Sequence, residues 1–201
     1  MKKDIRIAFV GDSFVNGTGD PEYLGWTQRV CQYIQKNNQN IELTAYNLGV
    51  RRETSSDILK RWEDEVQARL IDGDKFIVVF SFGVNDCVTI DGKQRVDLDI
   101  SVKNFQNILS KAKSKYDEVL FIMPPTINDN KVNNHIEELI KDYTKVCIDL
   151  EINYINKFNE LKRNNIWKKE TNQNDGAHPK SKGYSIFANL ILEDEKMMIL
   201  K

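Results

Sequence analysis

The sequence predicts an α/β fold, a parallel β-sheet between two layers of helices. Two observations support this fold class. Five short runs of apolar, largely β-branched residues recur along the chain, as expected for parallel strands covered on both faces. Helical patterns separate these runs, and strand–helix alternation is typical of a parallel sheet with helices packed on it. The runs span residues 5–10, 41–48, 75–82, 118–123 and 152–155.

The helices are predicted from apolar residues that recur every three or four positions. The segments 23–37 and 55–71 each place such residues near one face. Thr54 and Asp57 have the spacing of a capping box, which predicts that the second of these helices begins there. Further helices are expected at about 100–116, 132–149 and 181–193. The segments 84–97 and 164–180 are expected to be long irregular loops, and such loops are often functional.

Length and composition indicate one domain spanning residues 1–201. Hydrophobic residues make up 40% and charged residues 29% of the chain, which is typical of a soluble globular protein. The net charge of −1 lacks the basic excess of nucleic-acid-binding domains, so no nucleic-acid partner is expected. No window approaches the ~18 apolar residues of a membrane span, so no stable membrane insertion is expected.

The cysteines and the first residues indicate a cytoplasmic protein. Three cysteines, an odd number without a C-x-x-C pair, suggest neither a disulfide framework nor a zinc site. A reducing compartment is therefore the simpler interpretation. Asp4 and Arg6 interrupt the apolar run that a signal peptide would need.

Four short motifs lie where predicted strands end or where a long loop precedes the last helix. They are G-D-S at 11–13, N-L-G at 47–49, G-V-N-D at 83–86 and D-G-A-H-P at 175–179. The carboxyl ends of parallel strands share one edge of the sheet, and ligands bind there. We therefore expect the four motifs to converge.

Together the motifs hold the groups that acyl transfer needs. Ser13 is the candidate nucleophile, and its hydroxyl needs an adjacent base. His178 is the candidate base and acid, since the unperturbed imidazole pKa lies near ~6.5. Asp175, three residues earlier, can reach the other imidazole nitrogen and fix its tautomer. The candidate oxyanion donors are the N–H groups of Ser13 and Gly49 and the side-chain amide of Asn85.

Each motif by itself has an ordinary explanation as a turn or loop, and their joint occurrence in this order favours catalysis. The chain has two histidines, and His135 lies in a polar helix start typical of a surface residue. Asp12 and Asp86 are expected to accept backbone hydrogen bonds near their turns. An incidental divalent-cation site between them is the alternative.

At these four motifs the chain resembles the SGNH hydrolases, also called GDSL esterases and lipases. The motifs follow the family's order and span residues 11 to 179; Phe14 stands where the family often has Leu. The resemblance implies a flavodoxin-like three-layer α/β/α sandwich with a five-stranded parallel sheet. It also implies a Ser–His–Asp mechanism with no metal and no organic cofactor. It does not imply a particular substrate.

The expected function is hydrolysis of small carboxylic esters by a serine esterase, through an acyl-enzyme. The loops are modest in length, so short or small acyl groups are favoured. Tyr23, Trp26 and Arg52 are candidates for the substrate pocket, although Trp26 also fits a core position. The apolar residues 197–200 fit either a cap on the core or a homodimer contact. The alternative function is a non-catalytic flavodoxin-like module that binds a phosphate, a flavin or a glycan, which would leave Asp175 and His178 without a role.

Overall fold

The computed structural model describes the backbone of residues 2–200 and the side chains of residues 2–197, and a five-stranded parallel sheet organises this part of the chain. The strand order is β2-β1-β3-β6-β7, the order of flavodoxin-like folds. All four neighbouring pairs are parallel, so the carboxyl ends of the strands lie at one edge. The strands are β1 (Lys3–Gly11), β2 (Ile41–Gly49), β3 (Lys75–Ser81), β6 (Glu118–Ile122) and β7 (Asn153–Ile155).

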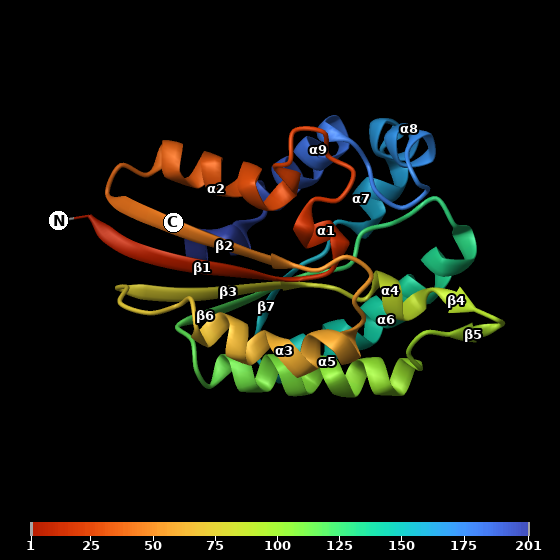
Figure 1. Cartoon of the computed structure of the whole chain (residues 1–201), viewed down its shortest axis with the longest axis horizontal. Coiled ribbons are helices and arrows are strands. Elements are labelled where there is room, and N and C mark those ends of the chain that lie inside the picture. Colours follow the sequence, from red (N-terminus) through yellow and green to blue (C-terminus); the bar gives the residue numbers. More distant parts are fainter. Residues whose placement is uncertain (1, 201) are drawn as a thin grey trace.

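Helices cover both faces of the sheet (Figure 1). On one face α2 (Gly25–Asn37) packs beside α9 (Ser181–Leu192), next to α8 (Asn165–Gln173). On the other face α3 (Ser55–Gln67) packs beside α5 (Leu98–Lys113), and α5 contacts α6 (Asn130–Asp149). This arrangement confirms the predicted three-layer sandwich. The shorter elements are α1 (Ser13–Asn16), α4 (Val84–Cys87), the hairpin of β4 (Thr89–Ile90) and β5 (Lys93–Gln94), α7 (Phe158–Arg163) and the 3₁₀ helix η1 (Glu195–Leu200).

An aromatic cluster fills the space between β3, β6 and the helices α5 and α6. The rings of Phe105 and Tyr143 stack with their centroids 3.7 Å apart, and Phe82 and Phe121 meet Phe105 edge-on. All four side chains are at most 1% exposed. Edge-to-face and stacked pairs stabilise a core beyond the burial of their area, so this cluster holds the sheet rigidly under the edge where the motifs lie.

The capping box predicted at Thr54 and Asp57 is present at the start of α3. The loop predicted over residues 164–180 is wrong in its first half, where α8 forms. Asn164 caps that helix by accepting the N–H groups of Ile166 and Trp167 at 3.0 Å each. The helix has few apolar residues, so its period was too weak to detect.

The apolar C-terminus caps the core at Met197, which is 1% exposed. The side chains of residues 198–200 lie outside the described part of the chain, and the homodimer contact stays a prediction. None of the helices in the described residues is long and apolar enough to cross a membrane.

Candidate active site

Strand β1 delivers Ser13 to the carboxyl edge of the sheet. A Cβ on Gly11 would lie 2.0 Å from the backbone oxygen of Ser81, so only glycine fits where β1 and β3 run this close. Asp12 then caps α1, because its Oδ1 accepts the N–H of Phe14 at 2.9 Å. Ser13 is therefore the first residue of a helix, and it is only 4% exposed.

Ser13, His178 and Asp175 form a continuous chain of hydrogen bonds. His178 Nε2 lies 2.8 Å from Ser13 Oγ, and His178 Nδ1 lies 2.8 Å from Asp175 Oδ2. The other oxygen, Asp175 Oδ1, accepts the backbone N–H groups of Ala177 and His178 at 3.0 and 2.8 Å. Asp175 thus shapes its own loop and also orients the imidazole. The structure brings together the three residues that the sequence singled out.

Aromatic side chains pack against the imidazole of His178 and fix its position. The ring of Phe14 lies 4.8 Å from that of His178, and Trp167 of α8 stacks on Phe14. Trp167 Nε1 donates to the backbone oxygen of Thr126 at 3.0 Å. The helix that the sequence did not predict therefore supports the side chain of His178.

Burial and nearby charges set the protonation states of His178 and Asp175. Burial lowers the pKa of His178 below 6.5, and the nearby Arg51 lowers it further, although Asp175 partly offsets both effects. Burial raises the pKa of Asp175, but the hydrogen bonds from His178 and Ala177 outweigh it and leave the pKa below 3.8. At neutral pH the imidazole is neutral and the carboxylate is charged, which are the forms that a general base and its orienting partner need.

The carboxylates of Asp12 and Asp86 have structural partners, as predicted. Asp86 accepts the N–H of Ser55 at 2.8 Å and the hydroxyl of Ser101 at 2.5 Å, and burial still raises its pKa. Burial raises the pKa of Asp12 to about 7, and its Oδ2 has no hydrogen-bond partner among the described residues. The described side chains contain no group of three or more His, Cys, Asp or Glu arranged to hold a metal ion.

The structure corrects the role expected for Gly49. Its N–H donates to Asn47 Oδ1 at 3.0 Å and already has a partner inside the protein. Glycine is needed here for another reason, since a Cβ would lie 2.1 Å from the backbone nitrogen of Asn16 in α1. Gly49 therefore lets β2 pack closely against the helix that carries Ser13.

Asn85 lies at the same edge, in α4. Its Nδ2 donates to the backbone oxygen of Glu53 at 2.9 Å, and its Oδ1 accepts from Arg95 at 3.3 Å. These contacts fix the orientation of the amide. One of the two amide N–H bonds has no partner within the described residues.

The three candidate pocket residues have different environments. Trp26 is 1% exposed and packs against Phe9 and Phe187, so it belongs to the core and the pocket assignment is corrected. Tyr23 is 91% exposed, with a left-handed φ of 57°, and borders an open hollow of about 380 Å³.

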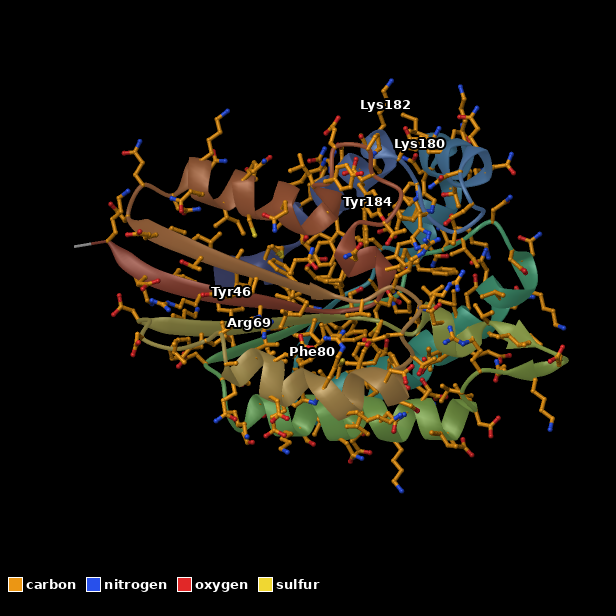
Figure 2. The ribbon with its side chains drawn as sticks, in the orientation of Figure 1. Tyr46, Arg69, Phe80, Lys180, Lys182 and Tyr184 are labelled. Atoms are coloured by element: carbon orange, nitrogen blue, oxygen red, sulfur yellow. The ribbon has the colours of Figure 1, made fainter. Side chains whose placement is uncertain are left out.

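The hollow beside Tyr23 also includes Gly19 and Lys180, and Lys180 lies at the start of α9 in Figure 2. A Cβ on Gly19 would lie 3.1 Å from the Cβ of His178, so this loop adjoins the hydrogen-bonded triad of Ser13, His178 and Asp175. Tyr184 of α9 points inward and donates its hydroxyl to the backbone oxygen of Thr18, which fixes the loop (Figure 2).

Arg52 is exposed and occupies the turn after β2. Its neighbour Arg51 is the one that meets the triad, with Nη2 3.7 Å from Asp175 Oδ2. The sequence offered no way to choose between adjacent arginines, because the turn geometry decides which side chain faces the site.

Two further residues that the sequence did not single out hold the edge together. Arg61 of α3 donates to the backbone oxygens of Gly11 and Leu48, and so ties the ends of β1 and β2. Asn47 donates from its Nδ2 to the backbone oxygen of Val15 at 2.7 Å. Asn47 belongs to the N-L-G motif, whereas nothing in the sequence distinguishes Arg61 from the other charged residues of its helix.

Known proteins share both the sequence pattern and the fold. The model of the GDSL-like Lipase/Acylhydrolase family matches residues 9–186. The uncharacterized protein YpmR of Bacillus subtilis (strain 168) is 27% identical over 218 residues, covering 96% of this chain and 82% of that protein.

Solved structures extend the similarity of fold. Axe2, an acetylxylan esterase from Geobacillus stearothermophilus, superposes with a TM-score of 0.78 at 18% identity, covering 98% of each chain. A lipase/acylhydrolase from Enterococcus faecalis superposes with a TM-score of 0.71 at 22% identity, covering 98% of this chain and 97% of that one. The match of the family model to most of the chain shows that this protein belongs to the GDSL-like Lipase/Acylhydrolase family, the SGNH hydrolases.

Proposed function

We propose that the protein is a serine esterase that hydrolyses small carboxylic esters. The observation that carries the proposal is the hydrogen-bonded chain from Ser13 Oγ through His178 to Asp175, with both links at 2.8 Å. A nucleophile, a base and an orienting carboxylate in hydrogen-bond contact are the elements of acyl transfer. The family assignment supports hydrolase chemistry.

The chemistry follows from these contacts. Ser13 Oγ attacks the ester carbonyl carbon while its proton passes to His178 Nε2, which gives a tetrahedral oxyanion and an imidazolium stabilised by Asp175. The oxyanion collapses, the bond to the alcohol oxygen breaks, and Nε2 protonates that oxygen. Water, deprotonated by the same nitrogen, then attacks the acyl-Ser13 ester. The acid leaves, and Ser13 recovers its proton.

The oxyanion needs donors that are free and fixed before the reaction. Since Gly49 N–H is already engaged, we assign this role to the backbone N–H of Ser13 and the second amide N–H of Asn85. The backbone N–H of Arg52 is a third candidate, because it has no hydrogen-bond partner in the described part of the chain. Its turn adjoins both Asn85 and the triad.

The acyl group is expected to be short, as in an acetyl ester. Ser13 and His178 are only 4% and 6% exposed, which leaves a long chain little access. Axe2, which shares the fold, is an acetylxylan esterase, and this points in the same direction. The buried free thiols of Cys31, Cys87 and Cys147 support a reducing compartment such as the cytoplasm.

The test is hydrolysis of p-nitrophenyl esters from acetate to decanoate by the intact protein and by Ser13→Ala. We expect activity on the acetate, a decline with chain length, and loss of activity in the variant. Ser110→Ala is the matched control, because Ser110 is exposed on α5 and donates its hydroxyl to the backbone oxygen of Asn107. Equal activity of the intact protein and Ser13→Ala would exclude Ser13 as the nucleophile. Inertness of both on every ester would favour the non-catalytic binding module.

A further inference from the structure

Three arginines gather beside the triad at the edge of the sheet, and we call Arg51, Arg52 and Arg95 the arginine rim. Arg51 is the innermost, with Nη2 3.7 Å from Asp175 Oδ2 and its side chain 57% exposed. The carboxylate of Asp175 is already engaged by His178 and by two backbone N–H groups. Arg51 therefore keeps donors free toward the solvent side of the site.

Arg52 occupies a backbone position that normally favours glycine. The turn from Val50 to Glu53 has Arg52 as its third residue, with a φ of 70°. A left-handed φ at this position of a turn is ordinarily met by glycine or asparagine, and other residues are strained there. The side chain of Arg52 is exposed and has no ion-pair or hydrogen-bond partner among the described residues. Position 52 thus holds a residue that strains the backbone, and its positive charge is not paired with any other described residue.

Arg95 brings a third positive charge to the same place. Its guanidinium donates to the backbone oxygen of Arg52 at 2.8 Å and to Asn85 Oδ1 at 3.3 Å. Both acceptors are neutral, and no carboxylate of the described residues lies within ion-pair distance of it. Arg95 thereby joins the turn of the arginine rim to the loop that carries Asn85.

The carboxylates near the rim neutralise it only in part: Asp175 lies 3.7 Å from Arg51, and the charge of Arg95 acts to lower the pKa of Asp57 and of Asp86. Glu53 accepts from Arg61 Nε at 2.7 Å, and Asp57 accepts from the hydroxyl of Thr54 at 2.7 Å. The chain as a whole has a net charge of −1, so the rim is a local concentration of positive charge and not part of a generally basic surface. Clustered, incompletely neutralised arginines attract anionic oxygens, and the guanidinium suits carboxylate and phosphate groups.

We infer that the arginine rim selects esters whose alcohol part carries an anionic group, a carboxylate or a phosphate. This inference rests on the proposed esterase function. In that reaction the alcohol oxygen has to approach His178 Nε2 to receive its proton, so the alcohol part lies on the histidine side of the site. Arg51 lies beside the same imidazole, at Asp175 on its Nδ1 side, so its exposed guanidinium meets an anionic group several atoms beyond the alcohol oxygen and not the alcohol oxygen itself. The substrate class is therefore short-chain acyl esters of acidic alcohols.

The test compares three acetyl esters that differ in the charge of the alcohol part: phenyl acetate, 4-acetoxybenzoate and 4-acetoxyphenyl phosphate. Their kcat/KM values are measured for the intact protein and for Arg51→Ala combined with Arg52→Gly. Glycine at position 52 keeps the left-handed turn and removes only the side chain. The kcat/KM of each anionic ester is divided by the kcat/KM of phenyl acetate for the same variant. Any change in the His178 pKa affects both values and so cancels in the ratio.

We expect the double variant to lose about threefold to tenfold of the relative kcat/KM for the anionic esters, as partly exposed ion pairs do. Arg51→Lys with Arg52→Lys should keep most of the preference, and added salt should weaken it in the intact protein. Arg69→Ala is the control, since Arg69 lies beyond the far end of α3 (Figure 2) and should leave the ratios unchanged.

The two anionic esters distinguish a carboxylate from a phosphate preference. Ratios that stay the same in the double variant would overturn the inference, as would a preference for anionic esters that all variants share. Neutral phenyl acetate tests the esterase function separately, because its hydrolysis must depend on Ser13 whatever the rim does. Inertness on all three esters would overturn both proposals.

Discussion

Asp175→Asn separates the structural and the chemical work of one carboxylate. Asparagine keeps an oxygen where Asp175 Oδ1 accepts the N–H groups of Ala177 and His178, so the loop should fold as before. The change falls on the second oxygen, which lies 2.8 Å from His178 Nδ1. An amide NH₂ group there donates instead of accepting, and Nδ1 has to become the acceptor. The imidazole proton then moves to Nε2.

That tautomer cannot accept the Ser13 proton, because Nε2, 2.8 Å from Ser13 Oγ, already carries its own hydrogen. The wrong tautomer in a Ser–His–Asp site lowers kcat by about 10⁴, which corresponds to about 5 kcal/mol in the barrier. The free energy of unfolding should change by less than about 1 kcal/mol, since the two backbone hydrogen bonds persist. The predicted signature is a nearly inactive protein of normal stability.

The assay is kcat/KM on p-nitrophenyl acetate, with urea unfolding measured on the same preparations. Asp149→Asn is the matched control, because Asp149 is exposed at the end of α6 and should retain full activity. If Asp175→Asn keeps activity within tenfold of the intact protein, the carboxylate does not set the tautomer and the reasoning is refuted. A large loss of stability would instead mean that the loop depends on the charge of Asp175.

Three further outcomes follow from the site. Because burial lowers the pKa of His178, kcat/KM for a neutral ester should rise with pH to a plateau with a midpoint below 6.5, and a midpoint above 7 would contradict this. Burial raises the pKa of Asp12 from 3.8 to about 7, so the folded protein binds this proton more tightly than the unfolded chain and loses stability as pH rises between those values. The free energy of unfolding of Asp12→Asn, measured with urea and compared with that of the intact protein, should therefore be up to about 4 kcal/mol higher at pH 8 than at pH 4. The same difference between the two proteins at both pH values would argue against the linkage. Gly49→Ala should lower the free energy of unfolding by at least about 3 kcal/mol, because its Cβ would lie 2.1 Å from the backbone nitrogen of Asn16. In the control Gly73→Ala the Cβ meets side-chain atoms at 3.1 Å, and urea unfolding should show little change.

The strands could be predicted because a sheet covered on both faces leaves its composition in the sequence. The apolar run of β1 and the Asp-x-x-His spacing before α9 are both local signals. Asp175 reaches His178 within one turn of chain, so their contact needed no knowledge of the fold. Their approach to Ser13 followed from a general property of parallel sheets, that loops after the strands share one edge.

What escaped prediction depends on orientation and on tertiary packing. The direction of Gly49 N–H is set by the side chain of Asn47, which no spacing reveals. Trp26 is amphipathic by composition, and only its contacts with Phe9 and Phe187 identify it as a core residue. Helix α8 has a weak apolar period because a single large side chain, Trp167, provides most of its anchoring to the rest of the molecule.

The distance along the chain between Ser13 and its base has a consequence during synthesis. The two residues are 165 positions apart, and a ribosome adding about 5–20 residues per second needs roughly 8 to 30 s to cover that interval. During this time strand β1 also waits for β3, its later neighbour in the sheet. If Ser13 and His178 act as proposed, a nascent or prematurely terminated chain that ends before residue 178 carries the serine without its base and should not hydrolyse esters. Under the proposed function, ester hydrolysis therefore reports that synthesis has passed residue 178 and that the sheet has formed.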